Sequence, residues 1–195
     1  MIAEAIDPLG SYDLVVHSIP PVGKKNIKLL AGKHTTIAVD APQGSLELKM
    51  NGYNEYKDLK SIVRKEGEID VLVVQDFNQV QKYITGMYDL EILTLPRTYV
   101  KGVNIAQSKT TTVEIPQAGL ATISINSKGF GSVFRQKGEE LVWVCNLNTT
   151  STRESIVLQP GLYKVIFRPL NSRLSIYTKE ESFEIESGQS TQVKL

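Results

Sequence analysis

One phrase occurs in this chain in three versions, and it decides the fold. The versions are PLGSYDLVVHSIP (residues 8–20), ITGMYDLEILTLP (residues 84–96) and QPGLYKVIFRPL (residues 159–170). In each version a glycine stands two residues before a tyrosine, and apolar residues follow in an alternating or continuous run. Alternation with a period of two is typical of a β-strand, and a preceding glycine is typical of a turn. Because the tyrosines recur about every 75 residues, we expect a repeated β module.

A second phrase follows each copy of the first. It reads IKLLAGKHTTIAV at residues 27–39, VNIAQSKTTTVEI at 103–115 and FEIESGQSTQVKL at 183–195. Two short alternating segments flank a polar turn that contains glycine or serine, and a threonine follows the turn. This pattern predicts a β-hairpin in each copy.

A third phrase occurs only twice, as VRKEGEIDVLVV from Val63 and FRQKGEELVWV from Phe134, which aligns Arg64 with Arg135. It predicts two strands around a charged turn, and one further alternating strand precedes each copy after a Pro-Gln dipeptide. The repeats therefore divide the chain into a half-repeat at 1–42, a module at 43–117 and a module at 118–195. Residues 1–42 contain only the back half of a module.

The predicted fold class is all-β: tandem antiparallel β-sandwiches, about two and a half copies of the repeat. Only DFNQVQKY, at residues 76–83, suggests a turn of helix. We expect the half-repeat to be ordered and to bury its apolar face against the next module or a symmetry mate. The side chains expected to face inward in the two modules are Leu46, Leu48, Val71, Val73, Leu90, Ile92, Val113, Ile115, Ile123, Ile125, Val142, Val144, Val165, Phe167, Val193 and Leu195. For 71/73 and 142/144 the alternation leaves the register open by one residue, because both segments are apolar on both faces.

The composition is that of an ordinary globular protein, with 41% hydrophobic residues and a net charge of +1. This charge balance gives no indication of a nucleic-acid partner. No apolar run approaches the length of a membrane span, and the first residues lack the order of a signal peptide. The single cysteine, Cys145, excludes a disulfide within the chain.

Candidate catalytic groups are scarce. His17 and His34 are the only histidines, and no His, Cys and carboxylate cluster has the spacing of a metal site. Cys145 lies in LVWVCNL and is interpreted as a core residue rather than a nucleophile. There is no glycine-rich phosphate loop. We therefore expect no catalytic residue, no metal, no cofactor and no enzymatic activity.

The repeated side chains are interpreted as structural. Tyr12, Tyr88 and Tyr163 hold the same position in every copy, which favours a ring packed on the core and a hydroxyl bonded to nearby backbone over a ligand platform. We expect Arg64 and Arg135 to be solvated partners of the neighbouring glutamates Glu66, Glu68 or Glu139. The candidate ligand-binding side chains are Tyr53 and Tyr56, in a predicted loop, and Trp143.

PGLYKVIF followed by FEIESGQSTQVKL resembles the carboxypeptidase-regulatory-like, or transthyretin-like, β-sandwich family, over the back half of each copy. The tandem order, with YDLVVHSIPP, TTTVEIPQAG and LQPGLY, is similar to the region after the von Willebrand factor A domain in bacterial surface proteins. The A domain and its Asp-x-Ser-x-Ser metal motif are not in this sequence. The ending STQVKL differs from the Tyr-Arg-Gly-Ser ending of transthyretin-like hydrolases, so that activity is not supported. The resemblance implies an extracytoplasmic place, at the cell surface or in the periplasm.

Two classes of function remain open. The first is a non-catalytic binding, adhesion or spacer module of a larger bacterial surface or envelope protein. The alternative is a carbohydrate-binding module that stacks Tyr53, Tyr56 and Trp143 on sugar rings. The expected partner is a protein or a glycan, without nucleic acid or membrane insertion, and the half-repeat also offers a route to a homo-oligomer.

Overall fold

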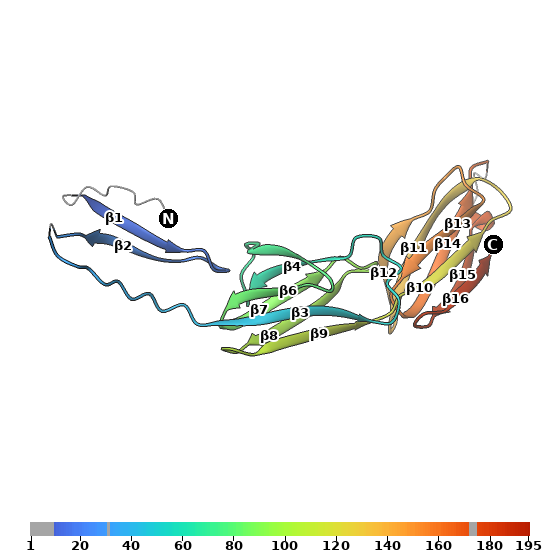
Figure 1. Cartoon of the computed structure of the whole chain (residues 1–195). Helices are drawn as coiled ribbons and strands as arrows, with labels where there is room; N and C mark the ends of the chain where they lie inside the picture. Colours follow the sequence, from blue (N-terminus) through green and yellow to red (C-terminus); the bar gives the residue numbers. More distant parts are fainter. Residues whose placement is uncertain (1–9, 31, 172–174) are drawn as a thin grey trace.

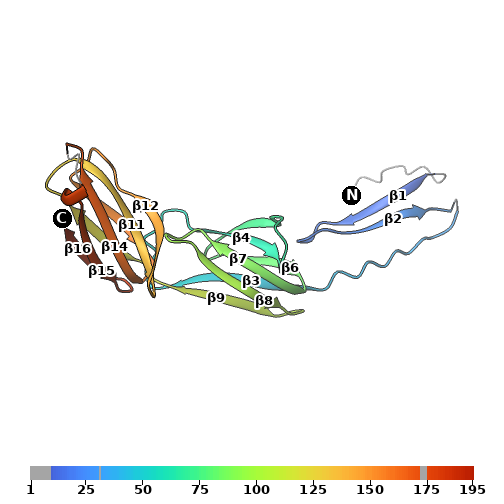
Figure 2. The same cartoon turned by 180° about the vertical axis from the view of Figure 1, so that it is seen from behind.

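The computed structural model describes residues 10–30, 32–171 and 175–195 of the chain. Three parts lie in a row along it: a hairpin at one end, a β-sandwich in the middle and a second β-sandwich at the other end (Figures 1 and 2). The all-β fold class predicted from the repeats is confirmed, because the described residues form strands and a single short 3-10 turn, Ser175–Tyr177.

The first sandwich contains the strands that follow residue 42. They form a three-stranded sheet in the order β6-β3-β9 and a four-stranded sheet in the order β5-β4-β7-β8. All neighbours are antiparallel except β3 and β9, which run parallel. The strands are β3 Gln43–Asn51, β4 Lys60–Lys65, β5 Val73–Asp76, β6 Val80–Ile84, β7 Gly86–Ile92, β8 Thr98–Ile105 and β9 Thr110–Pro116.

The second sandwich repeats this topology strand for strand. Its sheets have the orders β13-β10-β16 and β12-β11-β14-β15, and the parallel pair is β10 with β16. The strands are β10 Gly119–Ser124, β11 Gly129–Lys137, β12 Glu140–Asn146, β13 Arg153–Leu158, β14 Gly161–Pro169, β15 Lys179–Ile185 and β16 Ser190–Lys194. The internal sequence repeat therefore corresponds to a repeated sheet order.

Each sandwich has its own apolar core between its two sheets. The first core includes Leu46, Leu48, Val63, Tyr88, Leu90, Ile92 and Ile115, and the second includes Ile123, Val133, Val144, Tyr163, Val165, Phe167 and Val193. Val73 and Val113 are half-buried against the first core. Burial of alternate residues on facing strands is what the period of two requires.

Two of the residues predicted for the core are exposed: Val71 is 51% exposed and Val142 is 41% exposed. Val71 lies in the turn before β5, and Val142 lies on β12 with its neighbour Val144 pointing inward. The register did not slip by one residue, because Val73 and Val144 face inward as predicted: Val71 lies outside β5, and residues 140–143 at the start of the edge strand β12 are all exposed. The turn of helix expected at residues 76–83 is also wrong, since this stretch holds the end of β5, a turn and most of β6.

The threonine-containing phrase does not form the predicted hairpins. In the first sandwich its two segments are β8 and β9, which belong to different sheets, and in the second they are β15 and β16, again in different sheets. The turn between them is therefore an arch that carries the chain across the core. The shared threonine closes it, because Thr111 Oγ1 donates to the Asn104 carbonyl at 2.7 Å and Thr191 Oγ1 donates to the Glu184 carbonyl at 2.9 Å. Apolar and polar residues alternate in the same way in a hairpin and in an arch, so the sequence pattern does not distinguish the two structures.

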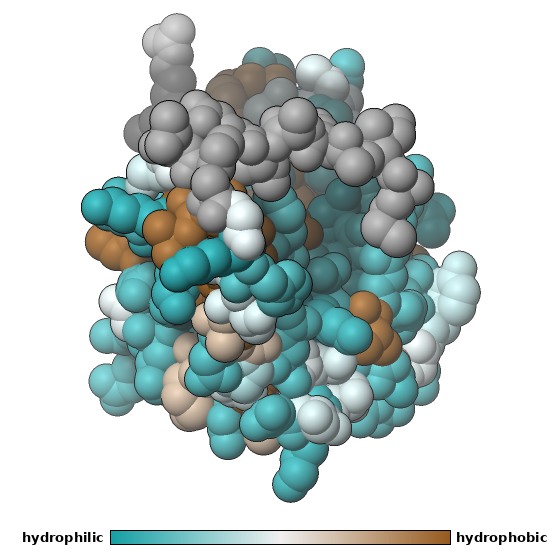
Figure 3. All heavy atoms as spheres, turned by 60° about the vertical axis from the view of Figure 1, so that its left-hand side comes forward, coloured by the Kyte–Doolittle hydropathy of each residue, from teal (hydrophilic) through white to brown (hydrophobic). Residues whose placement is uncertain are grey.

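The N-terminal hairpin consists of β1, Ser11–Val16, and β2, Val22–Lys28, in a two-stranded sheet. The predicted third strand, at residues 35–39, is assigned to no strand. Viewed from this end, the surface is mostly hydrophilic, with apolar residues in a few separate groups (Figure 3). Among the described residues no helix is long and apolar enough to cross a membrane.

Candidate functional site

The two sandwiches meet at the loop that follows β7. Leu95 in this loop packs against the core of the second sandwich. Its carbonyl accepts a 2.8 Å hydrogen bond from the Gln159 amide, which lies just beyond β13. Its own amide donates at 3.2 Å to the Tyr56 hydroxyl, to which Gln159 Nε2 also donates at 3.3 Å. Burial raises the pKa of Tyr56 against these hydrogen bonds, so the hydroxyl stays neutral at physiological pH.

The contact of Leu95 with the second core and with Gln159 is called a joint below. The same kind of joint occurs between the N-terminal hairpin and the first sandwich. Ile19 packs against the first core, and its carbonyl accepts a 2.8 Å hydrogen bond from the Ile84 amide. The loops are also closed alike: Ser18 Oγ donates to the Pro20 carbonyl and Thr94 Oγ1 to the Pro96 carbonyl, both at 2.7 Å. Each loop therefore inserts one apolar residue into the next unit and fixes it with one backbone hydrogen bond.

A groove of about 890 Å³ lies beside the joint of the two sandwiches. Its wall includes two exposed aromatic side chains, Tyr99 on β8 and Trp143 on β12, which are 63% and 57% exposed. The charged side chains that line it are Arg97, Arg135, Lys137 and Glu154. The groove therefore offers flat apolar faces together with a surplus of positive charge, which suits recognition of a polar or anionic surface rather than acid–base chemistry.

The three candidate ligand residues do not gather in one place. Tyr56 and Trp143 both line the groove, whereas Tyr53 is 72% exposed and is not part of its wall. Tyr56 is half-buried with its hydroxyl engaged at the joint, and Trp143 Nε1 donates to Asn146 Oδ1 at 3.1 Å. Sequence reasoning missed Tyr99, because it stands at an outward position of a strand and only the contact between sandwiches gives it a neighbour.

The repeated tyrosines of the two sandwiches occupy equivalent buried positions. Tyr88 and Tyr163 are at most 1% exposed. The Tyr88 hydroxyl donates to the Ile84 carbonyl and the Tyr163 hydroxyl to the Gln159 carbonyl, both at 2.6 Å. Burial raises the pKa of each phenol. Because the amides of Ile84 and Gln159 are the donors of the two joints, each tyrosine bonds the carbonyl of the residue to which the preceding unit is bonded.

The two arginines are not equivalent, in contrast to the sequence alignment. Arg64 is paired with Asp89 across the ladder, whereas Arg135 is paired with Tyr163, one position further along the strand. Arg64 therefore points outward, beside the buried Val63, and Arg135 shares the inward side with Val133. Arg135 donates to the Pro160 carbonyl at 3.2 Å.

The predicted partners of the arginines, Glu66, Glu68 and Glu139, are also wrong. Arg64 pairs with Glu91 at 2.9 Å, and Arg97 bonds the other oxygen of the same carboxylate. Burial would raise the pKa of Glu91, but the two arginines outweigh it and hold the pKa below its usual value. The ion pairs of Glu91 therefore join residues that the fold brings together rather than the glutamates next to Arg64 and Arg135 in the sequence.

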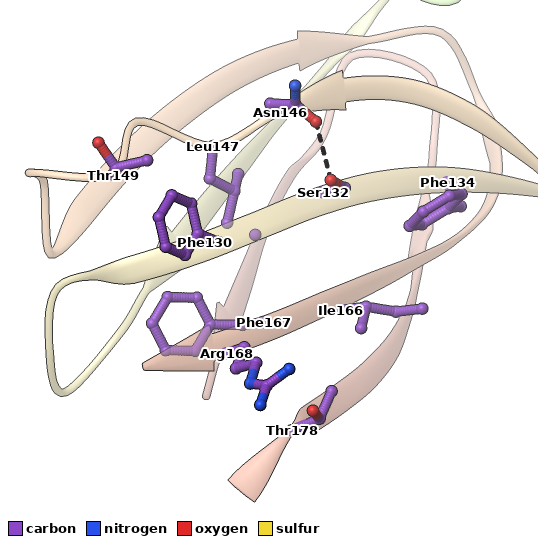
Figure 4. Close-up of a pocket in the computed structure, with 11 residues that line it drawn as sticks. Phe130, Ser132, Phe134, Asn146, Leu147, Thr149, Ile166, Phe167, Arg168 and Thr178 are labelled. Atoms are coloured by element: carbon purple, nitrogen blue, oxygen red, sulfur yellow. Dashed lines mark hydrogen bonds between the residues drawn. The ribbon is translucent and has the colours of Figure 1, made fainter. Parts of the chain in front are cut away.

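A second pocket, of about 490 Å³, lies on the four-stranded sheet of the second sandwich (Figure 4). Phe130 and Phe167 lie on one side of it, and the Ser132 hydroxyl donates to Asn146 Oδ1 at 2.8 Å (Figure 4). Arg168 is the single charged side chain among the described residues that line it. The described lining therefore combines aromatic surface with a cation.

The candidate reactive groups lie apart from one another. His17 and His34 are exposed, and Cys145 is half-buried against the second core, where burial raises the pKa of its thiol to about 11. Within residues 10–30, 32–171 and 175–195, no three His, Cys, Asp or Glu side chains lie close enough to hold a metal ion.

Comparisons with known proteins find no match to a protein-family model and none among curated proteins. Solved structures do match at low similarity. They include the Bacillus anthracis TIE protein (13% identity, TM-score 0.33) and the minor pilin GBS52 of Streptococcus agalactiae (13% identity, TM-score 0.38). A streptococcal ancillary pilin matches at 11% identity with a TM-score of 0.35.

The matches differ in how much of each protein they span. They cover 80% of this chain and 33% of the TIE protein, 80% and 94% for GBS52, and 95% and 75% for the ancillary pilin. The chain thus spans one third of the TIE protein structure. TM-scores this low carry no argument, so the fold and the proposals below rest on the geometry of the chain itself.

Proposed function

We propose that this chain is a non-catalytic spacer or binding segment of a larger bacterial surface or envelope protein. It consists of a half-repeat at 1–42 and modules at 43–117 and 118–195. The observation that carries the proposal is the joint, which is built twice with the same backbone hydrogen bond, from Ile84 to Ile19 and from Gln159 to Leu95. A joint repeated from unit to unit sets a constant angle between units and so keeps an array extended.

The two sandwiches are held together by more than a flexible linker. Leu95 packs, partly buried, against the second core, and Tyr56 accepts hydrogen bonds from both sides of the joint. An apolar anchor surrounded by hydrogen bonds resists bending, since bending would expose the anchor and leave the amides unpaired. This is the property that a spacer needs. The finer assignment, to a protein of the von Willebrand factor A type and to an extracytoplasmic place, is supported by the sequence resemblance.

The test is a measurement of rigidity. Spin labels at two exposed sites, one on each sandwich, should give a narrow distance distribution in the native chain. Replacing Leu95 by Ala removes the anchor, and the distribution should broaden while both sandwiches stay folded. The matched control is Leu162→Ala, which truncates a leucine that is 51% exposed on β14. A distribution equally broad in the native chain and in L95A would refute the spacer proposal.

Carbohydrate binding is the second candidate, favoured by the groove with Tyr99 and Trp143 in its wall. Planar aromatic faces stack on sugar rings, and the cations of the wall would favour an acidic sugar. A glycan array with the native chain and with Trp143→Ala tests it. Binding that is lost in W143A supports a glycan site, and an array without signal refutes it.

A further inference from the structure

The N-terminal hairpin is a copy of the β7–β8 hairpin at the level of single hydrogen bonds. Asp13 Oδ1 accepts from the Asn26 amide at 3.0 Å, as Asp89 Oδ1 accepts from the Gly102 amide at 2.9 Å. Both ladders shift register at the aspartate, between Tyr12 and Leu14 in one and between Tyr88 and Leu90 in the other. Strands β1 and β2 thus correspond to β7 and β8 of a complete module.

The segment after the hairpin, residues 35–41, corresponds to the last strand of a complete module. Gly32, Ser108 and Gly188 hold the same place in the repeat, and all have a positive φ, of 68°, 57° and 70°. The amide of the next residue donates three positions back in each turn, from Lys33, Lys109 and Gln189. Residues 35–41 therefore correspond to β9 and β16.

Within the part of the chain that the structure describes, both parts of the half-repeat lack a strand neighbour that the complete modules have. Strand β7 lies between β8 and β4, whereas among the described residues β1 pairs with β2 alone. Strand β9 pairs in parallel with β3, whereas residues 35–41 belong to no described ladder. The apolar side chains respond accordingly: Leu90 and Ile92 are at most 2% exposed, while their counterparts Leu14 and Val16 are only half-buried.

The two edges of the hairpin differ in how they are protected. Strand β2 carries the exposed Lys24 and Lys25 and a positive φ at Asn26, and lysines and bulges are the features that keep an outer edge from pairing. Strand β1 has the sequence SYDLVV, without lysine, proline or glycine. Strand β1 therefore lacks the residues that protect an outer edge, and its sequence is typical of an inner strand.

We propose that residues 10–41 are an acceptor for the front half of a repeat unit. The partner is a polypeptide segment with the pattern of residues 43–84 and 118–158. It supplies one strand antiparallel to β1, as β4 is to β7, and one strand parallel to residues 35–41, as β3 is to β9. Ile37 would then face the partner strand as Val113 faces Leu48. This is recognition by strand addition, with alternate apolar side chains setting the register.

A second copy of this chain fits the acceptor less well. Two copies of β1 can pair antiparallel about a two-fold axis. The same axis would place the two 35–41 segments antiparallel, whereas the repeat requires a parallel neighbour there. A front half would pair with β1 and with residues 35–41 at once, whereas a second copy would pair in the required direction with β1 alone.

The experiment adds a front half ahead of the half-repeat. A copy of residues 118–158 takes the place of residues 1–7, directly before Pro8, as Leu158 stands before Gln159. Backbone amides of β1 and of residues 35–41 should exchange hydrogen on the order of 100-fold more slowly than in the unextended chain, because local opening then has to break new ladders. Amides of β3 to β16 should be unaffected and serve as the internal reference.

The matched control carries the same extension with aspartate in place of Ile123 and Val133 in the copy only, since both are fully buried in their own sandwich. This variant should lose the added protection. Equal exchange in the two extended chains would overturn the proposal. It would also be overturned if the unextended chain were a dimer by light scattering with the β1 amides already protected, because the edge would then belong to a second copy.

Discussion

Replacing Tyr163 by Phe should destabilise the second sandwich although it leaves the ring in place. The hydroxyl donates to the Gln159 carbonyl at 2.6 Å, and Gln159 is only 3% exposed. Without the hydroxyl, this buried carbonyl loses its hydrogen-bond donor. An unsatisfied buried acceptor costs about 1–3 kcal/mol. The matched change Tyr88→Phe should cost less, about 0.5–1.5 kcal/mol, because Ile84, whose carbonyl is the acceptor, is only half-buried.

The chain provides its own probe for this measurement. Trp143 is the single tryptophan and lies on β12, so its fluorescence reports unfolding of the second sandwich. Urea unfolding followed at Trp143 should show a lower midpoint for Tyr163→Phe with an unchanged slope, which separates a loss of stability from a change in the surface exposed. Unfolding followed by circular dichroism covers both sandwiches and serves for Tyr88→Phe.

Tyr99→Phe is the control, because Tyr99 is 63% exposed and its hydroxyl reaches water. Its stability should stay within about 0.5 kcal/mol of the native chain. The reasoning is refuted if Tyr163→Phe is as neutral as this control, or if Tyr88→Phe proves the more costly of the two changes. Either outcome would mean that the hydroxyl bonds do not carry the structural role assigned to the repeated tyrosines.

Three further predictions concern single side chains. Gly44→Ala should unfold the first sandwich or lower its urea midpoint strongly, because a Cβ there would stand 2.2 Å from the Ala106 carbonyl, whereas Gly23→Ala should be tolerated, with its nearest contact at 3.5 Å. The amides of Gly102 and Gly67 hold the pKa of Asp89 below its ordinary value, so its contribution to stability is present above the pKa of the unfolded chain and is lost as pH falls through the lowered folded value; the gap in urea midpoint between the native chain and Asp89→Asn should therefore be larger at pH 7 than at pH 3. Cys145, with a thiol pKa of about 11, should resist a thiol reagent at pH 8 in the folded chain and react at once in urea; fast reaction of the folded protein would contradict its placement against the core.

Local patterns predicted the strands because a strand is defined by a period of two along the chain. Leu46, Leu48, Leu90 and Ile92 alternate in the sequence and are buried as expected. The same logic failed at Val71, which precedes β5, and at Val142, which lies in the exposed first part of the edge strand β12. It also failed for the arginines, since a ladder shifted by one position moves a side chain from one face to the other.

The candidate site depended on tertiary structure to a greater degree. Tyr56 stood out in the sequence as an aromatic residue among polar ones, and Trp143 was a further candidate for stacking. Tyr99 was not a candidate, and nothing in the sequence placed the three beside one groove. The contacts at the two joints could not be predicted from the sequence either. The segments HSIP and LTLP recur in the sequence, yet only the fold shows that Ile19 and Leu95 pack against the core of the following unit.

The amino-acid sequence by itself determined the repeat, the strands and the faces that the strands bury, because these follow from spacing along one chain. Tertiary structure alone decided which edges meet. Residues 103–115 alternate as a hairpin would, but the side chains of β8 and β9 cover one core from two sheets, so the chain crosses the sandwich and β9 pairs with the distant β3. The period of the side chains selects a face, whereas pairing requires a free row of backbone amides and carbonyls at the right distance, and only the folded arrangement of all strands determines where such a row lies.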